Sequence, residues 1–222
     1  MTGFRIEEYP DTELGPALAA RVAEDLIEAL AERATAALAV PGGTTPVFFL
    51  RALGRVDLPW ERVTVTLTDE RQVSVDSPRS NQRLLAETLF AGRAAAACFV
   101  PLYAAGAGAE AIGLSLTPLL PLDVCVFGMG EDGHIASLFP GALGLAAALA
   151  PDAPPAVETR PPGGEEPRIT LSAPVIAGAR KRYLLIKGEP KRAALDAAAA
   201  DPSAPFSAVL AAGGQTDVYY AP

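Results

Sequence analysis

The fold is decided by an apolar run and the glycine-rich turn after it, Asp123-Val124-Cys125-Val126-Phe127-Gly128-Met129-Gly130-Glu131-Asp132-Gly133-His134. Residues 124–127 are apolar at every position, and the run that begins at residue 123 is short enough to form a buried strand. The glycines and acidic residues that follow are typical of a turn. A strand that is apolar on both faces belongs to a sheet covered by helices on both sides. This stretch therefore predicts an α/β fold with polar residues at the end of a buried strand.

The same alternation of strand and helix runs through the rest of the chain. The pattern predicts strands at residues 4–9, 36–40, 63–68, 98–101, 123–127, 168–172, 182–187 and 215–220. It predicts helices at residues 14–34, 47–53, 80–89, 109–120, 189–200 and 205–211. Such alternation indicates a mostly parallel sheet with helices on both faces. Residues 151–167 are expected to be a surface loop or flap, because the alternation resumes unchanged after them.

The composition predicts one folded domain that spans residues 1–222. Half of the residues are hydrophobic and 20% are charged, which excludes an intrinsically disordered chain. The net charge is -8 and no run of basic residues occurs, so we expect neither a nucleic acid nor a membrane as a partner. The acidic start is unlike a secretory signal, and no long apolar stretch follows it, so we expect a cytoplasmic protein.

Cysteine and histidine are scarce in this chain. Cys98 and Cys125 each lie within an apolar run, and we expect both to be buried, reduced and inert. The single histidine is His134. Zinc sites usually draw their ligands from several histidines and cysteines. The chain is therefore not expected to hold a catalytic metal.

Four polar clusters directly follow predicted strands. They are residues 42–45, residues 69–71, residues 130–134 and the pair Lys187-Gly188. Open parallel sheets bind their ligands in the crevice beyond the carboxyl ends of the strands. We therefore expect these four clusters to surround one binding site.

The first of these clusters is suited to an anion. Gly42 and Gly43 offer unobstructed backbone amides, and Thr44 and Thr45 add hydroxyl groups directly before a predicted helix. Amides and hydroxyls in this arrangement are suited to phosphate. The spacing is neither that of a P-loop nor that of a dinucleotide-binding loop. A tight turn that merely requires glycine is the alternative.

Two cations and three other polar residues complete the candidate binding set. Arg71 and Lys187 stand where predicted strands end and would supply local positive charge to an acidic protein. Each can equally be a solvated surface charge, which is the usual state of such side chains. Asp69 and Glu70 are either solvated or hold the arginine beside them. Asn81 either contacts substrate or belongs to the cap of a helix.

His134 is the candidate general base. It lies in a turn whose glycines, Gly130 and Gly133, allow close backbone approach, and Asp132 precedes it by two residues. That carboxylate can orient the imidazole or raise its basicity. Imidazole is well suited to take a proton from water near neutral pH. No Gly-x-Ser-x-Gly nucleophile motif is present, so we expect activated water rather than a covalent acyl intermediate.

In this order, the clusters jointly resemble the 6-phosphogluconolactonases of the pentose phosphate pathway. The resemblance spans nearly the whole chain and rests on residues 40–46, 67–71, 80–81, 128–140, 168–171 and 183–188. It implies a three-layer, modified Rossmann-like fold, also found in glucosamine-6-phosphate deaminases. It further implies hydrolysis of 6-phosphoglucono-1,5-lactone to 6-phosphogluconate without a metal or other cofactor. By this similarity His134 would be the base, while Arg71, Lys187 and residues 42–45 would hold the phosphate.

Two other functions remain open on the sequence alone. The deaminases are similar to this chain in the string Asp132-Gly133-His134-Ile135-Ala136, but their chemistry implies an acid five residues after the histidine, where Phe139 stands here. A sensor that binds sugar phosphates without catalysis would keep the pocket and lose the reaction. The expected partner is a small-molecule sugar phosphate lactone. The protein is expected to be a monomer or a weak homo-oligomer. The sequence does not decide between these two states, because no sequence feature separates an exposed apolar patch from the core.

Overall fold

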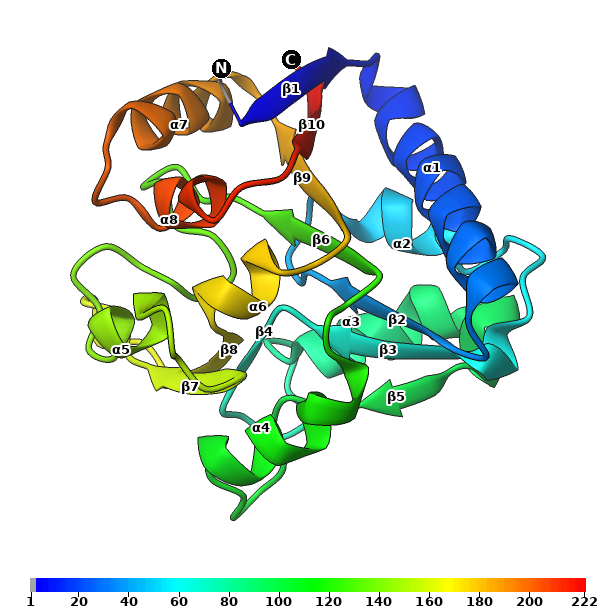
Figure 1. Cartoon of the computed structure of the whole chain (residues 1–222), viewed down its shortest axis with the longest axis horizontal. Coiled ribbons are helices and arrows are strands. Elements are labelled where there is room, and N and C mark those ends of the chain that lie inside the picture. The colour runs from blue at the N-terminus through cyan, green and yellow to red at the C-terminus, as the bar shows by residue number, and fades with distance from the viewer. Residues whose placement is uncertain (1–2) are drawn as a thin grey trace.

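A seven-stranded parallel sheet forms the centre of the computed structural model, which describes residues 3–222 (Figure 1). Its strands are β1 (Phe4–Glu8), β2 (Ala36–Val40), β3 (Val63–Leu67), β5 (Cys98–Val100), β6 (Val124–Gly128), β9 (Lys181–Lys187) and β10 (Thr216–Ala221). They lie in the order β1-β10-β9-β6-β2-β3-β5, and all neighbouring strands are parallel. Every residue of β2 is buried, as expected for a strand covered on both faces.

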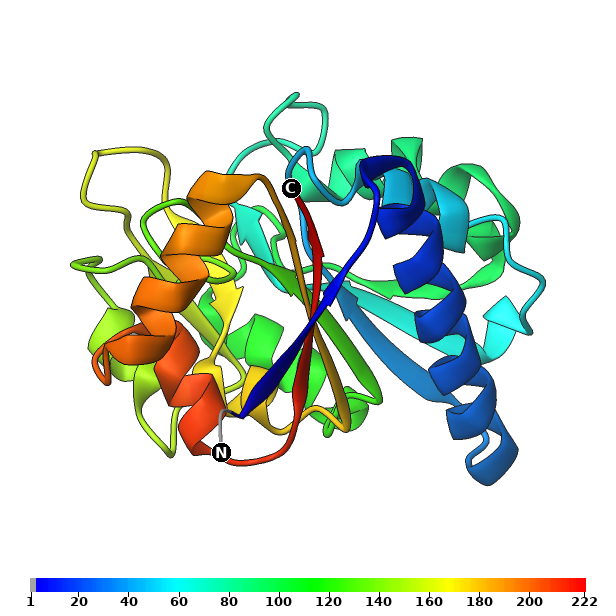
Figure 2. The same cartoon turned by 90° about the horizontal axis from the view of Figure 1, so that it is seen from above.

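Helices cover both faces of this sheet, which confirms the predicted three-layer α/β fold. They are α1 (Asp11–Glu32), α2 (Val47–Leu53), α3 (Asn81–Glu87), α4 (Ala109–Leu116), α5 (Leu145–Leu149), α6 (Ala173–Ala177), α7 (Glu189–Ala200) and α8 (Pro205–Ala211). Figure 2 shows α1 on one side of the sheet and α7 with α8 on the other. Helix α1 buries Leu18, Val22 and Leu26 completely, because residues four apart share one helix face.

Short 3-10 helices extend or join these elements at Trp60–Arg62, Leu89–Ala91, Arg93–Ala96 and Thr117–Leu119. Within residues 3–222, none of the helices combines the length and the apolar character that a membrane span requires.

A second, antiparallel sheet stands beside the main one and corrects two expectations. It has the order β4-β8-β7, with β4 (Asp69–Arg71), β8 (Arg168–Leu171) and β7 (Ala156–Thr159). The strand predicted at residues 168–172 is present, but it does not join the main sheet. The supposed loop at residues 151–167 contains β7. The four residues of β7 carry too little periodicity to be recognised, and which sheet β8 joins depends on its pairing with β4, far away in the sequence.

The two cysteines differ, contrary to the expectation that both are buried. Cys98 is exposed, because it begins β5 at the edge of the main sheet. Cys125 lies within the central strand β6 and is fully buried. Burial raises the pKa of the Cys125 thiol to about 12. Only Cys125 is therefore inert by burial, since the thiolate is the reactive form.

The strand order places a crevice at the middle of the main sheet. From β2 the chain runs through β3 to β5 at one edge, and it then returns to β6 on the other side of β2. Neighbouring strands whose connections diverge in this way leave room for a ligand beyond their carboxyl ends. The loops that follow β2 and β6 begin at residues 41 and 129, where two of the predicted polar clusters lie.

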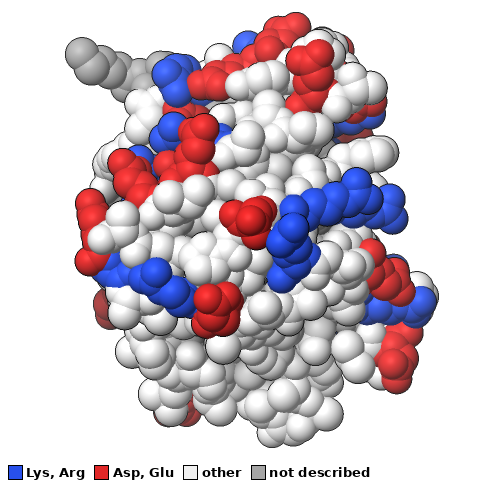
Figure 3. Space-filling model, turned by 90° about the vertical axis from the view of Figure 1, so that its right-hand side faces the viewer, with Lys and Arg blue, Asp and Glu red and all other residues white. Residues whose placement is uncertain are grey.

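Charges on the surface are mixed rather than segregated. Figure 3 shows acidic and basic side chains interspersed on the right-hand side of the molecule, with no continuous basic surface on that face. On α1, for example, Arg21 contacts both Glu24 and Asp25. An anionic ligand must therefore rely on cations at its own site.

Candidate active site

A cavity of about 240 Å³ opens at this crevice. The sequence-predicted residues that line it are Gly42, Gly43, Thr44, Thr45, Asp69, Arg71, Asn81, Gly130 and His134. The structure thus brings together three of the four polar clusters, which come from the loops after β2, β3 and β6. Lys187 is the predicted residue that does not reach the cavity. Asp132 lies directly behind the histidine.

The loop after β2 presents unused backbone amides to the cavity. Among the described residues 3–222, the N–H groups of residues 42–45 have no hydrogen-bond partner. Gly43 has a φ of 93°, which a residue with a side chain rarely adopts. A Cβ atom at Gly42 would stand 1.9 Å from the amide oxygen of Asn81. These glycines therefore allow both the turn and the close approach of Asn81.

Arg71 is one cation at the cavity. It comes from β4, and its Nη1 donates a hydrogen bond of 2.7 Å to the carbonyl oxygen of Arg79. Its Nε is buried and lacks a hydrogen-bond partner among residues 3–222. An arginine held from one side in this way keeps other N–H groups for an anion.

Lys191 is the second cation, and the sequence analysis did not identify it. It lies in the first turn of α7 and lines the cavity, where its Nζ donates to Thr45 Oγ1 over 3.3 Å. Burial lowers the pKa of Lys191, against an opposing effect of Glu131. The sequence did contain a signal for Lys191, namely a cation about one turn after Gly188. The helix after β9 begins at the carboxyl end of that strand, so a side chain in its first turn lies near the ligand-binding edge of the sheet.

Lys187, which was predicted to bind phosphate, instead points away from the site. Its Nζ lies 2.6 Å from a carboxylate oxygen of Asp11, and its side chain is 44% exposed. The structure places this residue at the end of β9 beside the start of α1. Lys187 does stand at the end of a strand, as expected, but its side chain points toward Asp11 and not into the cavity.

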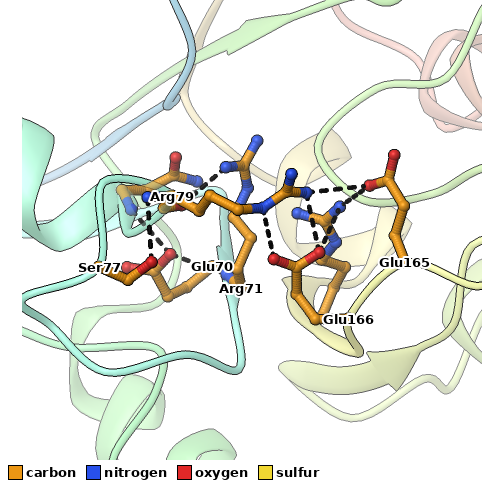
Figure 4. Close-up of polar contacts among 8 residues, drawn as sticks. Glu70, Arg71, Ser77, Arg79, Glu165 and Glu166 are labelled. Atoms are coloured by element: carbon orange, nitrogen blue, oxygen red, sulfur yellow. Dashed lines mark hydrogen bonds and ion pairs between the residues drawn. The ribbon is translucent and has the colours of Figure 1, made fainter.

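Glu70 is a buried carboxylate that accepts several hydrogen bonds, and it is not solvated. Only 2% of the residue is exposed. It accepts hydrogen bonds from the backbone N–H groups of Arg71, Asn81 and Gln82 at 2.7–2.8 Å, and from the hydroxyl of Ser80 at 3.1 Å. Glu70 thereby joins β4 to the start of α3 (Figure 4). Both Arg71 and Asn81, which line the cavity, are fixed by this carboxylate.

Two further contacts hold the polar wall of the cavity. Asp69 accepts a hydrogen bond of 2.6 Å from Ser137 Oγ, and its backbone carbonyl accepts one of 2.8 Å from Asn81 Nδ2. Ser80 caps α3 by accepting from the N–H of Arg83, which is a common role of serine at the start of a helix. Asn81 is therefore both part of the helix start and part of the cavity wall.

The imidazole of His134 lines the same cavity and contacts the carboxylate of Asp132. Nδ1 donates to Asp132 Oδ1 over 2.5 Å, which leaves a lone pair on Nε2. The turn is closed by the Gly130 N–H, which donates to the His134 carbonyl oxygen. A Cβ at Gly130 would stand 2.2 Å from the imidazole ring. The ring of Phe139 packs against the imidazole at a centroid distance of 4.1 Å.

The residues around the cavity together suit one kind of chemistry. Residues with free amides, threonine hydroxyls and two cations line the cavity, where they can hold a phosphate group. A histidine paired with a carboxylate faces the same cavity and can accept a proton from water. Within residues 3–222, no group of three or more His, Cys, Asp and Glu side chains is arranged to hold a metal ion. The site is therefore suited to proton transfer beside an anchored anion.

Comparisons with known proteins agree with this arrangement. A family model for glucosamine-6-phosphate isomerases/6-phosphogluconolactonase matches residues 10–218. A Mesorhizobium japonicum protein named 6-phosphogluconolactonase is 46% identical and covers 96% of this chain and 94% of its own. A Rhizobium meliloti protein of the same name is 43% identical and covers 99% and 98%. The crystal structure of a 6-phosphogluconolactonase from Shewanella baltica has a TM-score of 0.91 at 35% identity, covering 100% of this chain and 98% of that one. The resemblance seen in the motifs is thus confirmed, and the chain belongs to the glucosamine-6-phosphate isomerase/6-phosphogluconolactonase family.

Proposed function

We propose that the protein hydrolyses 6-phosphoglucono-1,5-lactone to 6-phosphogluconate, with water activated by His134 and without a metal ion. The observation that carries this proposal is a cavity lined both by His134, whose Nδ1 contacts Asp132, and by a set of groups suited to bind an anion. The names of the relatives in Mesorhizobium japonicum and Rhizobium meliloti support the same reaction. In this view the protein works as a cytoplasmic enzyme of the oxidative pentose phosphate pathway.

The reaction follows from the placement of the imidazole. Nε2 of His134 removes a proton from a water molecule as its oxygen attacks the C1 carbonyl carbon of the lactone. Asp132 accepts the Nδ1–H and stabilises the imidazolium that forms. The tetrahedral intermediate then collapses, the bond between C1 and the ring oxygen breaks, and the imidazolium returns its proton to that oxygen. The products are an open-chain acid and a regenerated neutral histidine.

The phosphate group is held by other residues of the same cavity. The amides of residues 42–45, the guanidinium of Arg71 and the ammonium of Lys191 supply donors and two positive charges. In this role Lys191 replaces Lys187 of the sequence-based expectation. Anchoring the phosphate orients the lactone, because one fixed end limits the approach of its carbonyl to the base.

The test is a coupled assay that detects 6-phosphogluconate above the spontaneous rate of lactone hydrolysis. The proposal expects rapid turnover of the phosphorylated lactone and much slower turnover of the unphosphorylated one. Release of ammonia from glucosamine 6-phosphate would indicate a deaminase instead. Binding of 6-phosphogluconate without any turnover of the lactone would indicate a sensor and overturn the proposed reaction.

The lowered pKa of Lys191 predicts a particular pH dependence of product binding. Burial favours the neutral amine, so the positive charge is lost at a lower pH than for an ordinary lysine. The affinity for 6-phosphogluconate is therefore expected to fall as the pH becomes alkaline. A Lys191→Arg variant should keep its affinity to higher pH, because arginine stays protonated. Titration calorimetry from neutral to alkaline pH measures the affinity for 6-phosphogluconate of the wild type and of Lys191→Arg.

A matched control is available in Lys187, which lies outside the cavity. Lys187→Arg should leave the pH dependence of product binding unchanged. Lys191→Met is expected to weaken binding about tenfold or more, since a hydrogen bond to a charged group contributes about 1.5–3 kcal/mol. Equal pH curves for the wild type and Lys191→Arg would contradict the role of Lys191.

A further inference from the structure

A cluster of four charged residues joins two segments beside the cavity, and we call it the ionic bridge. It consists of Arg79, Glu165, Glu166 and Arg168. Arg79 contacts Glu166 through two nitrogens, at 2.5 and 2.8 Å, and Glu165 at 3.4 Å. Arg168 contacts Glu165 closely and Glu166 at 3.9 Å. Figure 4 shows Arg79, from the loop before α3, reaching Glu165 and Glu166 in the segment before β8.

The ionic bridge includes the residue that holds Arg71. The hydrogen bond that fixes the Arg71 guanidinium ends on the carbonyl oxygen of Arg79. The loop around Arg79 has its own turn contacts through Ser77. The guanidinium of Arg79 adds the only ion pairs by which this loop contacts residues 165–166 within the described part of the chain. The position of Arg71 in the cavity therefore depends on Arg79 and its acidic partners.

Arg168 also lies next to Arg71 across the small sheet. The two arginines are directly paired in the β4–β8 register, so their side chains leave the same face of the small sheet. The Arg168 side chain is only 3% exposed, and its Nε, like that of Arg71, is buried without a partner among residues 3–222. Burial lowers the pKa of Arg168, and the charge of Arg71 lowers it further. Two like charges thus face each other beside the cavity.

This arrangement is a poor way to stabilise the fold. Arg79 and Glu165 are about half exposed, and ion pairs between exposed side chains contribute little to the free energy of unfolding. Opposed like charges on paired strands are destabilising, and a buried guanidinium nitrogen without a partner adds to the cost. What the arrangement does provide is a fixed position for the Arg71 guanidinium at the cavity where an anion is expected to bind.

We propose that the ionic bridge positions Arg71 for the phosphate group, and that Arg168 is the positioning residue by which the site prefers a phosphorylated lactone. This proposal rests on the proposed function, because it takes the phosphate of the substrate as the anion. Glu165 and Glu166 hold Arg168 and Arg79 in place from one side. The guanidinium of Arg168 stands opposite Arg71 and keeps it directed toward the cavity rather than toward the acidic segment.

The first test compares the dissociation constant of 6-phosphogluconate for the wild type, Arg168→Met and Arg168→Lys. Arg168→Met is expected to weaken binding about tenfold, and Arg168→Lys should retain part of the lost affinity. In the lactonase assay, KM for the phosphorylated lactone should rise with kcat little changed. Turnover of the unphosphorylated lactone should be unaffected. Equal losses for both lactones would indicate a merely structural role and overturn the proposal.

The Glu166→Gln variant distinguishes two effects of Glu166 on anion binding, namely the positioning of the arginines and the direct electrostatic effect of its negative charge. Removal of a negative charge near an anion site would by itself strengthen anion binding. Positioning predicts the opposite, a weaker affinity for 6-phosphogluconate by about threefold, because Arg79 and Arg168 lose a partner. Tighter binding by Glu166→Gln would overturn the proposal. Arg160→Met is the matched control, since this exposed arginine pairs with Glu158 on the same side of the molecule and should change nothing.

A double-mutant cycle shows whether Arg168 acts through Arg71. Arg71→Met and Arg71→Met/Arg168→Met are expected to bind 6-phosphogluconate equally weakly, because the second change has nothing left to position. Additive losses would overturn the proposal. Thermal unfolding of each variant shows whether it is folded. If a methionine variant does not fold, the affinities of Arg168→Lys and Glu166→Gln for 6-phosphogluconate decide whether Arg168 positions Arg71. Absence of any 6-phosphogluconate binding by the wild type would instead overturn the proposed function itself.

Discussion

Replacement of His134 by Asn is expected to lower kcat for the phosphorylated lactone by about 100-fold to 10,000-fold, the usual contribution of a general base. Asparagine can still donate a hydrogen bond to Asp132, but it cannot accept a proton from water. The anion-binding groups are untouched by this change. The dissociation constant of 6-phosphogluconate should therefore stay within about threefold of the wild-type value, because the groups expected to hold the phosphate are unchanged.

The measurement is the initial rate of the coupled assay with the spontaneous rate subtracted, together with calorimetric titration of the product. Asp132→Asn provides the matched variant. It keeps the imidazole and removes the charge behind it, so its kcat should fall by less than that of His134→Asn. Near-wild-type turnover by His134→Asn would reject the histidine as the base and leave the Asp132–His134 contact a structural feature of the turn.

Substitution of Glu70 by Gln is expected to lower the free energy of unfolding by about 2–4 kcal/mol, because a buried carboxylate with several donors is replaced by a group that must turn an N–H toward one of them. Two of those donors are backbone amides of Asn81 and Gln82 at the start of α3, where a helix leaves N–H groups without internal partners. The same change should weaken 6-phosphogluconate binding, since Arg71 and Asn81 lose a shared support.

Urea unfolding measures the first effect and calorimetric titration the second. Glu87→Gln is the control, because Glu87 lies at the other end of α3, is exposed and, among residues 3–222, forms an ion pair only with Arg83. Its effect on stability should stay within about 0.5 kcal/mol, as for other exposed positions. If Glu70→Gln were no more destabilising than Glu87→Gln, the buried hydrogen bonds of Glu70 would have to be much weaker than their distances indicate.

The main sheet could be predicted from the sequence because its strands are buried on both faces. Runs such as residues 36–40 and 124–127 are apolar without interruption, and the glycine turns after them mark where each ends. The small sheet could not be predicted in the same way. Strand β7 has four residues and pairs only with the nearby β8 in the described part of the chain, whereas β8 pairs on its other side with β4, which lies far earlier in the sequence. Local propensity does not contain that information.

The candidate site was predictable as a set of loops but not in every side chain. Residues 42–45 and His134 were predicted because polar, glycine-rich turns directly after buried strands lie at the ligand-binding edge of a parallel sheet. Lys187 ends β9 and Lys191 lies in the first turn of α7, and the sequence alone does not show which of the two side chains enters the cavity. The burial of Glu70 depends on the start of α3, which is more than ten residues away. The base role of His134 and the extent of the domain stay predictions.

The lack of room at Gly42 and Gly130 limits how this pocket can be redesigned. Any side chain at Gly42 would collide with Asn81, and any at Gly130 would collide with the imidazole. A library meant to broaden the range of accepted sugars should therefore leave both glycines untouched. Variation is better placed at Thr44, which is exposed and lines the pocket, because its backbone amide stays available to the phosphate whatever its side chain. There, new bulk would reshape the entrance while the base and its turn stay as they are.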